Sequence, residues 1–375
     1  MQAVQNAHMD GTQNRIGDLF VAGRGSAVTD GLHHFAERDA GWEATQVASV
    51  DQLAALCRHP SLPVVYGLSG LGRGLLHAWN VTAVPSGPAV TLAEKDCLGE
   101  IPCDLAVSQD GRMLVAANFG TDVPPGSGSL AVWSLAADGT PLGDGKVIAL
   151  TGASFATPVK QEVPHPHQVV FNGSLLYVPD FGADLVRRFT VDAAAATLTE
   201  IAGLPVPPGT APRHMVITDD AQLALVGELA STLLRGPVDG SAWAAAPSTT
   251  RTGPAKTRHA RNYPGDLKLS PDGRTVYLAN RGYDTIAVFA IDRAAPRLVV
   301  EVDVPAAWPQ HLLVTHAGLV VAGWDSSAVA LVPFDRGRPG TPTVLFECVG
   351  AGWLLPATRV GAIARRASGP HRVSM

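Results

Sequence analysis

The chain has 375 residues, of which 46% are hydrophobic and only 16% are charged, and it contains 39 glycines and 29 prolines. Few charges and many turn-forming residues favour short strands over long helices, so we predict an all-β protein. The net charge is −5 and no Lys- or Arg-rich block is present, which argues against a nucleic-acid partner.

The N-terminal sequence MQAVQNAHMDGTQNRIGD is polar. It lacks the apolar stretch of a signal peptide, and no later run approaches the ~20 apolar residues of a membrane helix. The four cysteines form neither a CxxC pair nor a secreted-type framework. We therefore predict a flexible segment over residues 1–16 and a soluble, cytoplasmic protein with reduced cysteines and no membrane partner.

Five segments of the chain repeat one pattern that starts at a proline. Each runs through two variable, often polar residues into an alternating strand, a turn and a second apolar strand. The segments begin at Pro102, Pro166, Pro212, Pro264 and Pro309. Their turns contain dipeptides that tolerate positive φ, namely Asp110-Gly111, Asn172-Gly173 and Asp272-Gly273. A third and usually a fourth strand follow, and four antiparallel strands per unit are typical of a β-propeller blade.

Two weaker units near Leu19 and Val64 bring the number of blades to seven. The first unit lacks an innermost strand, whereas the apolar segment CVGAGWLLPATR is left over after the seventh. We predict that this segment, around Trp353, pairs with the strand at Leu19 and closes the ring, because an open ring leaves an exposed strand edge. The prediction is one seven-bladed propeller over residues 17–358, followed by a tail over 359–375.

Polar residues recur at the positions that face the channel of such a ring. The two positions after each repeat proline are Cys103-Asp104, His167-Gln168, Arg213-His214, Gly265-Asp266 and Gln310-His311. The ends of the second strands add Asn118, Asp180, Glu228, Asn280-Arg281 and Trp324-Asp325. Because the first strand of every blade lines the channel, we expect two arginines, a histidine and a glutamate to meet at one end of the axis.

The charges of Arg213, Glu228 and Arg281 point to an anionic ligand. Burying two guanidinium groups is costly, and Glu228 alone cannot neutralise both. A ligand carboxylate or phosphate is the expected additional partner. For Asn118, Asp180 and Asp104 a structural role in hydrogen bonds between blades is favoured over a ligand contact.

His165 and His167, in the sequence PHPHQ, are the candidate metal pair. We expect strand geometry to direct the two side chains apart, and no Cys or carboxylate cluster completes a coordination shell. We therefore predict that the protein uses no metal and no other cofactor.

At these residues the sequence resembles the seven-bladed β-propeller lactonase family, which includes propeller-type 6-phosphogluconolactonases and carboxy-cis,cis-muconate cyclases. The most specific segments are CDLAVSQDGRMLVAANFG, PHPHQVVF with YVPDFGADLV, PRHMV with GELAST, and GDLKLSPDGRTVYLANRG. The chain departs from the family at Gly227, where Asn is more common, and in the inserted sequence DVPPGSGS after Thr121.

The resemblance implies a catalytic set made of His167, Arg213, Glu228 and Arg281. We predict His167 or Glu228 as the general base, Arg213 as the oxyanion stabiliser and Arg281 as the anchor for a phosphate or carboxylate. Further candidate substrate-binding residues share positions near the channel: His165, His214, Asn118, Asp180, Asp266 and His311.

The predicted function is hydrolysis of a small anionic sugar lactone similar to 6-phosphogluconolactone. Two alternatives remain at this point: a muconate-type lactonising cyclase, which would use the same four side chains, and a non-catalytic interaction propeller. The substrate is the predicted partner, and we expect a monomer or a weak homo-oligomer.

Overall fold

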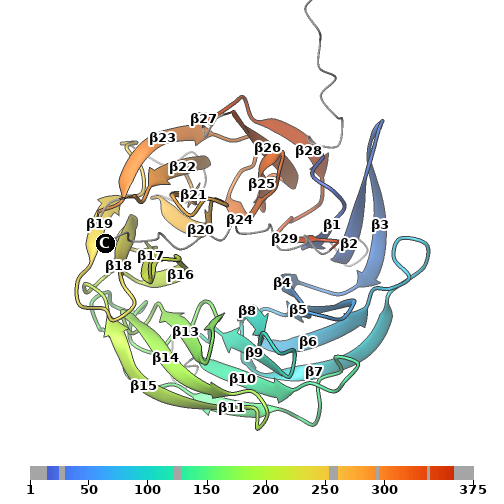
Figure 1. The fold of residues 1–375 in the computed structure, drawn as a ribbon, viewed down its shortest axis with the longest axis horizontal. Coiled ribbons are helices and arrows are strands. Elements are labelled where there is room, and N and C mark those ends of the chain that lie inside the picture. Colours follow the sequence, from blue (N-terminus) through green and yellow to red (C-terminus); the bar gives the residue numbers. More distant parts are fainter. Residues whose placement is uncertain are drawn as a thin grey trace, which may run out of the picture.

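The computed structural model describes residues 15–24, 30–121, 128–252, 261–292, 295–335 and 338–358. In these residues the chain forms seven antiparallel sheets of at least four strands arranged in a ring (Figure 1). This confirms the predicted all-β, seven-bladed propeller. Most of the predicted flexible N-terminal segment, the whole predicted tail and residues 122–127 of the insertion lie outside the described residues.

The strands follow one another blade by blade along the chain. The first two blades contain β1 (Leu19–Gly23), β2 (Gly31–Arg38) and β3 (Gly41–Ser49), then β4 (Leu53–Arg58), β5 (Val64–Ser69), β6 (Arg73–Asn80) and β7 (Val90–Glu100). The third and fourth contain β8 (Pro102–Val107), β9 (Met113–Asn118), β10 (Ser129–Ser134) and β11 (Lys146–Ala149), then β12 (Val170–Asn172), β13 (Leu175–Asp180), β14 (Leu185–Asp192) and β15 (Thr197–Pro205).

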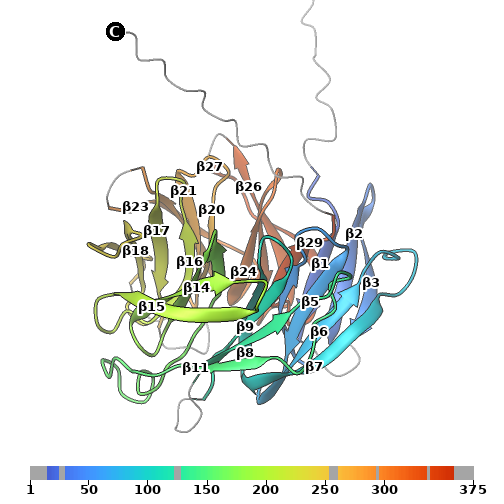
Figure 2. The same cartoon turned by 60° about the horizontal axis from the view of Figure 1, so that its bottom comes forward.

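The remaining blades repeat this order. The fifth and sixth contain β16 (Pro212–Ile217), β17 (Gln222–Gly227), β18 (Thr232–Pro237) and β19 (Ala244–Pro247), then β20 (Tyr263–Leu269), β21 (Thr275–Arg281), β22 (Thr285–Ala290) and β23 (Arg297–Asp303). The seventh contains β24 (Pro309–Val314), β25 (Gly318–Gly323), β26 (Ala328–Asp335) and β28 (Thr343–Glu347), with a short β27 (Arg338–Pro339) paired to the end of β26. The inner strands β8, β16 and β24 surround the centre of the ring in Figure 1, and Figure 2 shows the same ring tilted.

The last strand, β29 (Trp353–Pro356), is the innermost strand of the first blade. It pairs antiparallel with β1, so that Leu354 lies opposite Val21 and Pro356 opposite Leu19. Leu354 is buried in one apolar cluster with Leu19, Val21 and Phe35. The predicted closure of the ring by the C-terminal segment is therefore confirmed.

Apolar side chains from neighbouring blades fill the space between them. In one such cluster Leu130 and Val132 of β10 pack with Leu176 of β13 and Phe189 of β14. Because side chains alternate across a strand, each blade has two faces, and both are apolar where they pack against the neighbouring blades. This explains why a middle strand such as β9 is buried along its whole length, and why the polar residues gather where these strands end.

Two local features position those polar residues. The predicted hairpin glycines Gly111, Gly173 and Gly273 have φ values of 75°, 59° and 71°, which residues with a Cβ adopt at a cost. In addition, the ladder register shifts directly after the repeat proline, for example between Pro212 and Met215. Such a bulge takes Arg213 and His214 out of the regular alternation and reorients their side chains.

None of the described residues forms a helix with the length and apolar character required to cross a membrane.

Candidate active site

The centre of the site is a carboxylate shared by two arginines. Glu228 directly follows β17, and its Oε2 lies 2.8 Å from Arg213 Nε and 2.7 Å from Arg281 Nη2. The side chains of Arg213 and Arg281 are 4% and 7% exposed, and that of Glu228 is 15% exposed. We call these three residues the inner cluster. It holds two buried cations and one carboxylate, as the sequence led us to expect.

The two arginines of the inner cluster differ in how they are held. Arg281 donates from Nη2 to Glu228, from Nε to the carbonyl of Tyr263 at 2.9 Å and from Nη1 to Gln310 Oε1 at 3.2 Å. Its guanidinium also lies 5.0 Å from the ring centroid of Trp308. Arg213 has fewer contacts, since its Nε meets Glu228 as an ion pair and its buried Nη1 has no hydrogen-bond partner among the described residues. Burial, then the charge of Arg281, lowers the pKa of Arg213 to about 10.

His167 lies beside the inner cluster in its neutral form. Burial, followed by the nearby charges of Arg213 and Arg281 and by the proximity of His214, holds the pKa of His167 well below 6.5. Its Nδ1 is buried and has no hydrogen-bond partner in the described part of the chain. A neutral imidazole can accept a proton at neutral pH, which is the requirement for a general base.

The predicted partner of His167 in a metal pair, His165, has a different environment. Its ring stacks on Phe119 at 4.3 Å, and its Nδ1 lies 2.7 Å from the carbonyl oxygen of Phe119. Both histidines precede β12 and flank Pro166, which forms an antiparallel bridge with Asp180. Residues two apart in an extended segment share a face, so the expectation that strand geometry separates the two side chains was wrong. No three His, Cys, Asp or Glu side chains in the described ranges are grouped to hold a metal ion.

A cavity of about 470 Å³ opens over this arrangement, and we call it the mouth cavity. Its lining includes His167, Glu228 and Arg281 but not Arg213, which contacts Glu228. The other lining residues are Phe119, Thr157, Lys160, Phe181, Leu229, Arg261, Tyr263 and Trp308. The structure therefore brings the four candidate catalytic residues together, three of them at the cavity surface.

Sequence reasoning missed the aromatic wall of the mouth cavity, although the repeat contained a signal for it. Phe119 and Phe181 occupy the same repeat position as Glu228 and Arg281, immediately after or at the end of the second strand. Two further members, Tyr263 and Trp308, directly precede repeat prolines, as His165 does. Superposing the repeats at these two positions would have identified all four aromatic residues.

Other candidate substrate-binding residues do not line the mouth cavity and instead join neighbouring blades. In four places a side chain accepts a hydrogen bond from a backbone N–H of the next inner strand: Asp104 from Val169 at 2.8 Å, Gln168 from Met215 at 2.7 Å, Asp266 from Leu312 at 2.8 Å and His311 from Leu354 at 3.2 Å. The second variable position of the repeat thus supports the ring itself.

Asp266 has several charged and polar partners in addition to Leu312. Its carboxylate contacts His214 Nδ1 at 2.9 Å and Lys268 Nζ at 2.6 Å, and His311 Nε2 lies at 3.7 Å. Burial opposes the ionisation of Asp266, but Lys268 and the two histidines hold its pKa well below the usual range. Burial lowers the pKa of His214 to about 4 and that of His311 well below 6.5, so both are neutral near pH 7.

Asn118 and Asp180 are likewise bonded within the protein. Asn118 Nδ2 donates to the carbonyl of Cys97 at 2.9 Å. Asp180 Oδ1 accepts from the backbone of His165 at 2.8 Å, and Asp180 Oδ2 forms a buried ion pair with Arg187 Nε at 2.7 Å. These contacts support the structural role that the sequence favoured for both residues.

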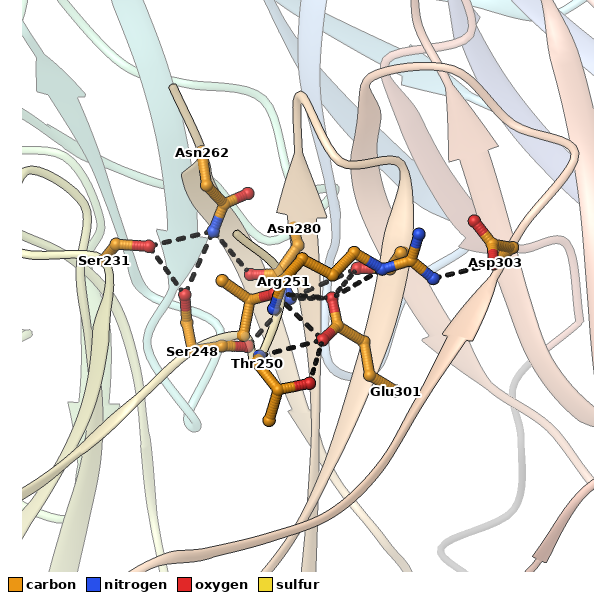
Figure 3. A network of polar contacts seen from close by, with 10 residues as sticks. Ser231, Ser248, Thr250, Arg251, Asn262, Asn280, Glu301 and Asp303 are labelled. Carbon is orange, nitrogen blue, oxygen red and sulfur yellow. Dashed lines mark hydrogen bonds and ion pairs between the residues drawn. The ribbon is translucent and has the colours of Figure 1, made fainter. Parts of the chain in front are cut away.

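Figure 3 shows a polar network at the junction of the fifth and sixth blades. Asn262 Nδ2 lies 2.9 Å from Asn280 Oδ1 and 3.0 Å from Ser248 Oγ. Glu301 accepts hydrogen bonds from Thr249, Thr250 and Thr285. Asn262 directly precedes Tyr263 and Asn280 directly precedes Arg281, so the network fixes the backbone from which two cavity residues project.

Burial of Asp104 in the channel leads to a pH prediction. Its pKa is raised from 3.8 to about 7, mainly by burial. A carboxyl whose pKa is higher in the folded state destabilises the fold as pH rises from the unfolded pKa through the folded one. We therefore expect the free energy of unfolding of Asp104→Asn to rise relative to that of the wild type between pH 5 and pH 7, by an amount on the order of a few kcal/mol. Above about pH 7 this difference should stay constant. Thermal melts across this range would test it, and a difference that does not vary with pH would contradict it.

Comparisons with known proteins agree with this geometry. The family described as "Lactonase, 7-bladed beta-propeller" matches residues 31–341. The 6-phosphogluconolactonase of Bacillus subtilis is 25% identical over 271 residues, which cover 71% of this chain and 75% of that protein. A probable 6-phosphogluconolactonase of Arthroderma benhamiae is 30% identical over 218 residues, covering 54% of this chain and only 52% of that protein.

A solved structure extends the similarity over most of the chain. The periplasmic gluconolactonase of Pseudomonas aeruginosa superimposes with a TM-score of 0.78 at 25% identity, covering 90% of this chain and 98% of that one. The family match spans most of the blades and includes all four candidate catalytic residues. The chain therefore belongs to the seven-bladed β-propeller lactonase family.

Proposed function

We propose that this lactonase-family protein hydrolyses a small anionic sugar lactone of the 6-phosphogluconolactone type in the mouth cavity. The observation that carries the proposal is a neutral imidazole, His167, beside a carboxylate that two arginines share. Relatives named 6-phosphogluconolactonase and a structural neighbour named gluconolactonase support the class of substrate.

In the proposed reaction His167 is the general base. It takes a proton from a water molecule as the water oxygen attacks the lactone carbonyl carbon. The resulting oxyanion is stabilised by Arg281, which lines the cavity, in place of Arg213, which we had predicted from the sequence and which does not line it. The bond between the carbonyl carbon and the ring oxygen then breaks, and the ring oxygen receives the proton from His167.

Glu228 has an organising role in this proposal. Its Oε2 is already engaged by both guanidinium groups. It holds Arg281 at the cavity and offsets part of the charge that burial of two arginines would otherwise leave uncompensated. Arg213 supports the arrangement from behind, because it is paired with Glu228 and buried away from the cavity. The positive charge that these residues provide makes a metal ion unnecessary for this chemistry.

Purified protein assayed against a panel of 6-phosphogluconolactone, gluconolactone and muconolactones would test the proposal. We expect hydrolysis of a sugar lactone at a rate that exhaustive dialysis against EDTA does not change. A large loss of rate that zinc or magnesium restores would contradict the metal-free mechanism. Turnover of muconolactones alone would favour the cyclase alternative, and no turnover on the panel would favour an interaction propeller.

We also propose a cytoplasmic protein, monomeric or weakly self-associating, that binds neither nucleic acid nor membrane. All four cysteines are free thiols, which suits a reducing compartment. The gluconolactonase of P. aeruginosa is periplasmic, so subcellular fractionation is the deciding measurement, and recovery outside the cytoplasm would contradict the proposed location.

A further inference from the structure

We propose that Lys160 and Arg261 form an anion anchor at the rim of the mouth cavity, which selects a phosphorylated sugar lactone over a neutral one. The inference rests on the proposed function and adds the residues that recognise the phosphate. It also moves this role away from Arg281, which we had predicted from the sequence as the anchor.

Neither arginine of the inner cluster is well placed to bind a phosphate in the mouth cavity, because Arg281 is held by protein acceptors and Arg213 does not line the cavity. Every nitrogen of the Arg281 guanidinium donates to an acceptor in the protein, and Glu228 lies between Arg281 and Arg213. A phosphate placed there would compete with Glu228 for the same guanidinium groups. Nη1 and Nη2 of Arg281 each keep one further N–H, which is enough for a carbonyl oxygen, so we assign the ester to the inner cluster and the phosphate to another part of the lining.

Lys160 and Arg261 are the other cations that line the mouth cavity, and both are exposed. Lys160 lies in the connection between β11 and β12, and Arg261 in the connection between β19 and β20. These connections lead into the fourth and sixth blades, so they flank the fifth blade, which carries Glu228. Among the described residues that line the cavity, Glu228 is the one carboxylate, against the three cations Lys160, Arg261 and Arg281. The lining therefore carries two positive charges in excess, which matches a phosphate monoester dianion.

A chain of ring contacts connects the rim to the inner cluster. The guanidinium of Arg261 lies 5.3 Å from the ring centroid of Tyr263, whose ring is 6.1 Å from that of Trp308, and Arg281 lies 5.0 Å from Trp308. Arg261 also donates from Nη2 to the carbonyl of Leu229. One wall of the cavity thus runs from Arg281 across the rings of Trp308 and Tyr263 to the guanidinium of Arg261, which also contacts Leu229.

This layout fits a substrate with its reacting ester at one end and its charge at the other. The aromatic rings contact the carbon skeleton, and the rim offers a fork of N–H donors on Arg261 and a compact ammonium on Lys160. Because the rim is exposed, water screens each contact, so we expect about a tenfold effect per residue rather than the larger effects seen at buried sites.

The test compares kcat/KM for 6-phosphogluconolactone and gluconolactone in wild type, Lys160→Ala, Arg261→Ala and the double variant. We expect the preference for the phosphorylated lactone to fall about tenfold in each single variant and further in the double variant, mainly through KM. Lys160→Arg should retain the preference. Arg112→Ala with Arg274→Ala is a matched control, because it removes two exposed cations from hairpin turns outside the mouth cavity.

The outcomes separate this inference from the proposed function. A wild-type protein that hydrolyses no lactone would overturn the proposed function and the anchor together. Wild-type hydrolysis of both lactones with equal kcat/KM, or an unchanged preference in a folded double variant, would overturn the anchor alone. Unchanged melting temperatures of the variants would establish that the loss concerns binding rather than folding.

Discussion

Substituting His167 with glutamine is expected to lower kcat for lactone hydrolysis by about 10²–10⁴-fold, the contribution of a positioned general base. The dependence of the wild-type kcat/KM on pH gives a second test of His167 as the base. Because the pKa of His167 is held well below 6.5, the base form persists into acid solution, and kcat/KM should stay level below pH 6.5 and fall only when the pH drops through the lowered pKa. Stopped-flow or pH-stat assays across this range would measure both effects.

Glu228→Gln is the matched comparison for this variant. Removing the carboxylate leaves Arg213 and Arg281 buried without their shared anion, so we expect the free energy of unfolding to fall by about 3–5 kcal/mol. His167→Gln, in contrast, removes no charge at neutral pH and should leave stability nearly unchanged. Two results would assign the base to Glu228. One is a His167→Gln variant with the kcat of the wild type, and the other is a stably folded Glu228→Gln variant whose kcat falls by about 10²–10⁴-fold while that of His167→Gln does not.

Deleting the chain from Cys348 onward is expected to prevent stable folding. The deletion removes β29, exposes the edge of β1 and uncovers the apolar cluster that contains Leu19, Val21 and Phe35. Each large apolar side chain that loses its burial costs about 1.5–3 kcal/mol, so several together approach the roughly 5–15 kcal/mol that stabilises a typical domain.

The control for this truncation is a chain that ends at residue 358, because it keeps β29 and every described residue. We expect that shorter chain to melt with the wild type in circular dichroism or calorimetry. A truncation at Cys348 with an unchanged melting temperature would contradict a structural role for β29 in ring closure.

The number of blades, the closure of the ring and the meeting of Arg213, Glu228 and Arg281 could be predicted from the sequence. Their signals are local and repeated: a proline, alternating apolar residues and a turn such as Asp110-Gly111 define one blade, and each further copy strengthens the pattern. Residues at equal repeat positions must meet at the axis once the ring closes. The apolar segment around Trp353 belongs to none of the repeats, so it is expected to pair with the one strand edge that remains free, that of the strand at Leu19.

The assignment of individual side chains depended on the tertiary structure. The register shift after Pro212 reorients Arg213 and His214 in a way that alternation does not predict. As a result His214 contacts Asp266 of the next blade, while Arg213 reaches Glu228 behind the cavity surface. A bulge is a property of the paired strands, so the sequence of one strand does not specify it.

Lys160 and Arg261 had no signal in the repeat, because they lie in connections that differ between blades in length and sequence. Only closure of the ring brings the connection before the fourth blade and the connection before the sixth to the lining of one cavity. The seven-bladed ring and the charged residues at its axis could be read from the amino-acid sequence, since both follow from local patterns summed over repeats. The tertiary structure decided which side chains line the mouth cavity, because that depends on contacts between residues about a hundred positions apart, which no local pattern encodes.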